Sequence, residues 1–225
     1  LLVWSFLVGA ALMSAVGVTC HAILPVFGKE AVVANKIFFG VVHSLLAAAL
    51  VCLGGFRLFE KVMSVCIGAM FLVVVLTAIV ICPSWSEAAQ GMLIPTTPKG
   101  GVLWTIALMG GVGGTVTVLS YGYWIREKGR TGSEDLKTCR IDLTTGYFMT
   151  AVFGLGMVII GNSLGSLEGG GATVIVNIAQ QLETRMGVAG TVVKWMFLIG
   201  AWGAVFSSVL SVWQSIPYIF ADVWT

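Results

Sequence analysis

The chain has 225 residues, of which 58% are hydrophobic and only 10% are charged, and its mean hydropathy is +1.00. Soluble domains carry about 25% charged residues, so this composition excludes a soluble globular domain and indicates a polytopic membrane protein. The formal net charge of +2 comes without basic clusters interleaved with aromatic residues, so nucleic acid is not an expected partner.

Six apolar segments are long enough to cross a bilayer, since a spanning helix needs about 20 residues. In chain order they cover residues 3–26, 37–56, 62–81, 102–125, 143–164 and 192–218. We therefore expect an all-α fold: one transmembrane domain over residues 1–225, surrounded by the lipid bilayer.

The distribution of basic residues predicts the orientation of these six spans. The loops after the second and fourth spans hold seven basic residues: Arg57, Lys61, Arg126, Lys128, Arg130, Lys137 and Arg140. The loops on the opposite side hold five: Lys29, Lys36, Lys99, Arg185 and Lys194. Because cytoplasmic loops carry the excess of Lys and Arg, we expect both chain ends in the cytoplasm and a multi-pass protein of the cell membrane, of the bacterial inner-membrane type.

The chain begins within an apolar run and stops just after Asp222-Val223-Trp224, without a polar tail. A signal peptide would need a charged amino-terminal region and a cleavage site, and neither is visible. We expect an internal piece of a longer protein, in which the remaining helices are partners that complete the functional site.

Titratable residues are rare within the predicted spans. The first, third, fourth and fifth spans contain no carboxylate, which argues against a proton wire through these helices. His21 and His43 lie in the first and second spans, and each is a candidate ligand or proton relay, or else a hydrogen-bonded packing residue. The five cysteines show no metal-finger spacing, so we interpret them as small packing residues.

The fourth span contains a glycine-rich stretch, Met109-Gly-Gly-Val-Gly-Gly-Thr-Val-Thr117. Each glycine in a helix interior costs roughly 1 kcal/mol relative to alanine, and unwound backbone at membrane depth is tolerated only against protein or a water-filled cavity. Secondary transporters build substrate sites from such broken helices. We predict a substrate site at Gly113, Gly114, Thr115 and Thr117, where backbone carbonyls of residues 112–114 lie beside the two threonine hydroxyls.

Further hydroxyl and amide side chains lie close to this stretch or on the last span. We predict that four of them line the pathway or support the site: Ser120, Ser207, Ser211 and Gln214. The other interpretation is helix–helix contact through small and polar residues. No P-loop, dinucleotide-binding or nucleophile–His–acid pattern is present, so we expect neither an enzyme nor a bound cofactor.

Four motifs resemble the Nramp (natural resistance-associated macrophage protein) family of divalent metal transporters. They are Leu53-Gly-Gly-Phe-Arg-Leu-Phe-Glu-Lys-Val62, Arg126-Glu-Lys-Gly129, Arg140-Ile-Asp142 followed by Gly146, and Gly203-Ala-Val-Phe-Ser-Ser208. The resemblance covers nearly the whole chain. It implies part of a LeuT-like inverted-repeat fold, from about the third to the eighth helix, and a divalent metal ion as the transported substrate.

Two departures from the family pattern suggest a divergent branch. Where the sixth helix of the family carries Met-Pro-His, this chain has Gly114-Thr-Val-Thr117, and the third-helix carboxylates are missing from Ala11-Leu-Met-Ser-Ala-Val-Gly17. Oxygen ligands without a thioether favour harder ions, and Mg keeps several waters in its sites. With Thr115 and Thr117 in the place of the family's metal ligands, the resemblance implies that Mg or Mn is moved by alternating access, with weak or no proton coupling.

Two other functions fit the same spans. One is a LeuT-fold carrier of an amino acid or another small organic solute, whose carboxylate would bind at half-helix N-termini. The other is a non-transporting membrane scaffold. The metal carrier and the organic-solute carrier differ at the break of the family's first helix, and this chain does not include that helix. An acidic residue at the break favours a metal ion as substrate, whereas a glycine-rich break without one favours a carboxylate. A scaffold would give no response in any uptake assay.

Overall fold

The computed structural model describes residues 2–94, 100–103, 105–106, 115–164 and 172–224. These residues are mostly helical, and no strand occurs among them. The helices are α1 (Leu2–Ile23), α2 (Val32–Ile81), α3 (Trp85–Leu93), α5 (Thr115–Glu127), α6 (Leu136–Leu164), α7 (Thr173–Arg185) and α8 (Gly190–Trp224). Short 3-10 turns, Ser133–Asp135 and Gly187–Ala189, precede α6 and α8. Within the described part, α1, α2, α6 and α8 are long and apolar enough to cross a membrane, which agrees with the predicted all-α membrane fold.

The helix α2 is 50 residues long and contains a turn at Gly55, so it makes two passes through the bundle. Gly55 has φ 62° and ψ −176°, a backbone conformation that glycine adopts without the steric cost of a Cβ atom. From the sequence, the second span was expected to end at residue 56, with a loop at 57–61. The structure turns within one residue instead, and Arg57 and Lys61 lie in the helix that follows.

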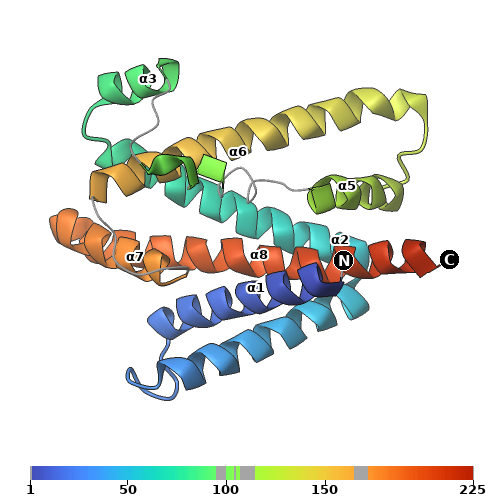
Figure 1. The fold of residues 1–225 in the computed structure, drawn as a ribbon, viewed down its shortest axis with the longest axis horizontal. Helices are drawn as coiled ribbons and strands as arrows, with labels where there is room; N and C mark the ends of the chain where they lie inside the picture. Colours follow the sequence, from blue (N-terminus) through green and yellow to red (C-terminus); the bar gives the residue numbers. More distant parts are fainter. Residues whose placement is uncertain (1, 95–99, 104, 107–114, 165–171, 225) are drawn as a thin grey trace.

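The helix α8 runs through the middle of the bundle (Figure 1). The helix α1 and the first half of α2 lie on one side of it, and the second half of α2 and then α6 lie on the other (Figure 1). The two ends of the chain lie at the same end of the bundle, which is also where α5 leads into α6 (Figure 1). We call it the terminal end.

Glycines allow two of the helices to approach closely. A Cβ atom on Gly17 of α1 would lie 2.2 Å from the carbonyl oxygen of Lys36, and one on Gly40 of α2 would lie 2.9 Å from that of Met13. Both distances are too short for any side chain. Small residues at such crossings let backbones pack closely, which is the main source of helix association in lipid.

The buried apolar side chains form two clusters around α8. One joins α2, α6, α7 and α8, and its members include Val74, Ile160, Leu182 and Leu198. The other joins α1, both halves of α2 and α8, and its members include Val16, Ala47, Phe59 and Leu210. Both clusters include α8, which explains its central place in the fold.

The turn between α1 and α2 is organised by Asn35, which is completely buried. Its Oδ1 accepts a hydrogen bond from the backbone N–H of Phe27 at 3.1 Å. Its Nδ2 donates to the carbonyl oxygens of Gly28 and Ala31 at 3.0 and 2.9 Å. One amide side chain therefore satisfies three backbone groups of the turn, as burial of polar groups requires.

Two helices, α3 and α7, were not expected from the sequence. Both are too short to cross a membrane, and a search for long apolar segments passes over them. In α7 the buried residues are Ile178, Ala179 and Leu182, which face the core. An ion pair of 2.6 Å between Glu183 and Lys194 ties α7 to α8.

Candidate functional site

The predicted substrate site falls at the beginning of α5. Gly113 and Gly114 lie outside the described residues, and so do the side chains of Thr115 and Thr117. Thr115 is the first described residue of α5. The site itself therefore stays a prediction, and the structure shows what surrounds the rest of α5.

The helix α5 is held against α8 by a buried polar contact. Trp124 donates from its indole Nε1 to Oε1 of Gln214 at 2.5 Å, and the Gln214 side chain is only 4% exposed. Ser120, one turn earlier on the same face of α5, is 2% exposed. Two predicted pathway residues, Ser120 and Gln214, are thus buried in the part of the bundle that contains α5.

Three serine hydroxyls of α8 donate to carbonyl oxygens of their own helix; Ser207 is one of the predicted residues, and the predicted Ser211 contributes a carbonyl oxygen. Ser207 is buried, and its hydroxyl donates to the carbonyl oxygen of Ala204 at 2.8 Å. Ser208 donates to the same carbonyl at 3.1 Å, and Ser215 donates to that of Ser211 at 2.7 Å. Such back-bonding satisfies a hydroxyl within its own helix. These contacts fit the helix-packing interpretation, and they leave each hydroxyl oxygen able to accept a further bond.

Four polar contacts hold the last turn of α5 and the residue after it at the terminal end, and we call them the α5 clamp. They join Trp124 to Gln214, Tyr123 to Asp222, Tyr218 to Glu127, and Lys128 to Glu60. The rings of Tyr123 and Tyr218 also stack, with centroids 5.5 Å apart. The clamp thus fastens α5 to α8 and to the second half of α2.

A cavity of about 200 Å³ lies beside the clamp, between α2, α5 and α6. Its walls are apolar, from residues such as Phe59 and Met63, and the ion pairs Lys128–Glu60 and Arg130–Asp142 are at its edge. The hydrogen bond to the Asp142 carboxylate raises the pKa of Arg130 above its ordinary value, so this cation stays charged at any physiological pH. The first pair joins the residue after α5 to α2, and the second joins the α5–α6 connection to α6.

His43 has both ring nitrogens engaged in hydrogen bonds. Its Nδ1 lies 2.8 Å from the carbonyl oxygen of Phe39 and must donate to it. Its Nε2 then accepts from the indole Nε1 of Trp202 at 3.0 Å, and the Cys20 sulfur lies 3.7 Å away. These partners select the neutral imidazole protonated at Nδ1. They favour the packing role for His43, because a metal ion could bind the Nε2 lone pair only by displacing the Trp202 hydrogen bond.

His21 differs from His43, because its Nδ1 is buried and has no hydrogen-bond partner among the described residues. Buried polar atoms without partners are uncommon, so the relay interpretation of His21 stays open. Within the described part of the chain, no three His, Cys, Asp or Glu side chains gather in a way that could hold a metal ion. The predicted oxygen site at residues 112–117 is not covered by that observation.

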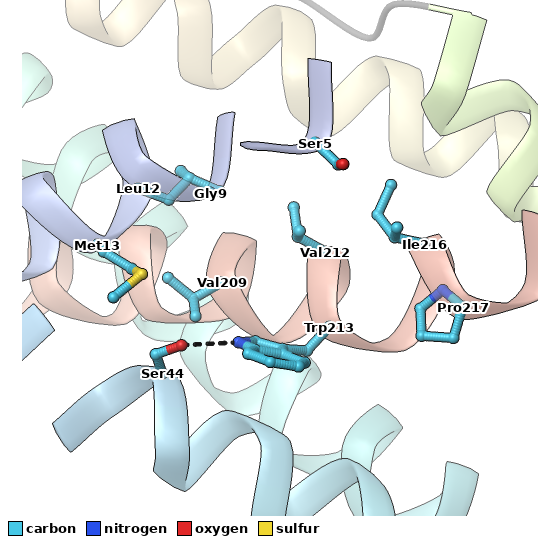
Figure 2. A pocket seen from close by; sticks show the side chains of 10 residues that line it. All are labelled: Ser5, Gly9, Leu12, Met13, Ser44, Val209, Val212, Trp213, Ile216 and Pro217. Carbon is cyan, nitrogen blue, oxygen red and sulfur yellow. Dashed lines mark hydrogen bonds between the residues drawn. The ribbon is translucent and has the colours of Figure 1, made fainter. Parts of the chain in front are cut away.

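Another cavity, of about 210 Å³, lies between α1, α2 and α8 (Figure 2). Leu12, Met13 and Val209 are among the apolar side chains that line it (Figure 2). The Ser44 hydroxyl at its edge already accepts a hydrogen bond from Trp213 at 3.0 Å. Its lining does not offer the carboxylate, carbonyl or imidazole ligands that a hard divalent ion needs.

The chain matches the family model described as natural resistance-associated macrophage protein-like, over residues 2–225. The chain belongs to the Nramp family. Members of this family are divalent metal transporters rather than enzymes, so the substrate class is a divalent metal ion and the chain is a multi-pass membrane protein. The comparisons with curated proteins and with solved structures found no match.

Most of the α5 clamp was not expected from the sequence. Trp124, Tyr123 and Asp222 were not singled out, and Tyr218 was only the end of a polar stripe. Trp and Tyr are enriched near the ends of membrane spans, and this enrichment was an available signal. Their partners lie on another helix, however, so no spacing along the chain reveals the pairs.

Proposed function

We propose that this Nramp-family protein carries a hard divalent cation, with Mg or Mn favoured, by alternating access and with weak or no proton coupling. The ion is the substrate. The protein acts as a carrier without a bound cofactor and catalyses no chemical step.

The observation that carries the proposal is the composition of residues 112–117, at the beginning of α5. The chain offers carbonyls at residues 112–114 and hydroxyls at Thr115 and Thr117, and oxygen donors suit Mg and Mn. The N-terminus of a helix carries a partial positive charge, which by itself opposes a cation at this place. We therefore infer that a carboxylate from another helix of the complete protein supplies the negative charge.

The clamp suggests how access alternates. With the clamp closed, the terminal end of α5 is tied to α8 and α2 by several contacts at once. Opening the site toward that end requires these contacts to separate, while Ser120, Ser207, Ser211 and Gln214 supply polar surface along the route. Rocking of one helix group against another around a midplane site is the usual mode of such carriers.

Metal uptake by proteoliposomes that contain the complete protein tests the ion and the coupling. We expect Mg or Mn uptake that changes little when a pH gradient is imposed. Thr115→Met should shift preference several-fold toward Cd, because a thioether is a softer ligand than a hydroxyl. Thr150→Met is the matched control, since Thr150 is exposed on α6 and its hydroxyl only bonds the carbonyl of Gly146.

Acidification of the lumen at a rate matched to metal entry would show that a proton path exists elsewhere in the protein. Equal Cd preference in the Thr115→Met and Thr150→Met variants would contradict a role of Thr115 at the site. Uptake of an amino acid in place of a metal would favour the organic-solute carrier, and no uptake of either would favour the scaffold.

We further propose that the terminal end lies on the cytoplasmic side of the cell membrane. The support is the excess of Lys and Arg at this end. In a variant whose five native cysteines are replaced, Ser133→Cys should react only with a reagent that reaches the cytoplasm. Ser86→Cys and Glu168→Cys should react with an impermeant reagent added outside. Labelling of Ser133→Cys from outside intact cells would reverse the orientation.

A further inference from the structure

The short helix α3 separates apolar and polar residues completely. At 3.6 residues per turn, Trp85, Ala88, Ala89, Met92 and Leu93 fall on one face. Ser86, Glu87, Gln90 and Gly91 fall on the other. The helix begins at an N-cap, where the Ser84 hydroxyl accepts from the backbone N–H of Glu87 at 3.4 Å. The pattern is that of a helix with one side in an apolar medium.

The apolar face of α3 is not covered by the described protein. None of its residues is buried, and Trp85, Met92 and Leu93 are 54%, 64% and 83% exposed. Contact between such side chains and water is unfavourable. An apolar partner is therefore needed on this side of the helix.

The position of α3 indicates what that partner is. Only three residues separate α3 from Ile81, the last residue of the membrane helix α2. The last turns of α2 expose Leu76, Ile79 and Val80, which is the surface that a spanning helix presents to lipid. Figure 1 shows α3 outside the bundle, beside this end of α2. The exposed apolar side chains of α3 therefore follow directly on the exposed apolar end of a membrane helix.

We propose that α3 binds the lipid bilayer at its border with water, at the end of the bundle opposite the terminal end. Trp85, Met92 and Leu93 lie among the acyl chains, and Glu87 faces water. Trp is enriched at this border, and amphipathic helices bind there through their apolar face. Bound in this way, α3 anchors the connection that leads from α2 toward α5.

Tryptophan quenching by lipids with brominated acyl chains tests this placement. The complete protein is reconstituted in brominated and in ordinary lipid, and the contribution of Trp85 is obtained by subtracting the fluorescence of a Trp85→Phe variant. We expect brominated lipid to remove most of this contribution, while aqueous iodide removes little of it.

The matched control moves the indole to the polar face by combining Trp85→Phe with Glu87→Trp. Its added fluorescence should respond to iodide and resist brominated lipid. If the Trp85 contribution is insensitive to brominated lipid, the proposal is overturned. Quenching by iodide would then place Trp85 in water, and resistance to both quenchers would place it against protein.

Discussion

Replacing Gly113 and Gly114 together by leucine should reduce metal uptake by the complete protein to background while leaving the protein inserted in the membrane. Two leucine side chains would fill the space that an ion needs. They would also restore a continuous helix, because leucine favours the helical state by roughly 1 kcal/mol per residue over glycine. Radioactive metal uptake into proteoliposomes measures the loss, and detergent extraction with size-exclusion chromatography measures insertion and folding.

Gly122→Leu is the control for this experiment. Gly122 lies in the same helix α5, and a Cβ atom there would meet nothing within 4 Å. This variant should transport like the wild type, which separates a site effect from the general effect of a larger residue in α5. Wild-type uptake by the double glycine variant would sink the hypothesis of a site at residues 112–117.

Gly17→Leu should prevent the protein from folding into a stable bundle. A Cβ atom at this position would lie 2.2 Å from the backbone oxygen of Lys36, and a backbone atom cannot move aside as a side chain can. Overpacking a core costs typically 1–3 kcal/mol even where side chains adjust, and total stabilities are only about 5–15 kcal/mol. We expect aggregated protein in size-exclusion chromatography, or a much lower unfolding temperature in detergent.

Gly9→Leu is the matched substitution on the same helix α1, and a Cβ atom there would meet nothing within 4 Å. It should unfold at nearly the wild-type temperature. Gly40→Leu, at the facing position of α2 (2.9 Å from the Met13 oxygen), should behave like Gly17→Leu. If Gly17→Leu and Gly9→Leu unfold at the same temperature, the close crossing of α1 and α2 is not a feature of the folded protein.

Composition and the lengths of the apolar segments predict the membrane class and the helical fold, because both depend only on transfer of side chains and backbone into lipid. The predicted end of the second span, at residue 56, lies one residue from Gly55, where α2 turns. The turn is tighter than the loop expected at 57–61, since Gly55 reverses the chain within one residue. The amphipathic helices α3 and α7 were missed, because their pattern is short and its partner, lipid or core, is not visible along the chain.

By itself, the sequence determines that this protein spans the membrane as an all-α bundle, and its motifs identify the Nramp family. Which polar groups meet was decided only by the tertiary structure. His43 is engaged on both ring nitrogens because α8 brings Trp202 to it, and Gln214 holds α5 because Trp124 lies across the helix interface. A side chain's spacing along one helix says which face it occupies, but its partner depends on how the helices cross. That crossing depends on close contacts such as those at Gly17 and Gly40.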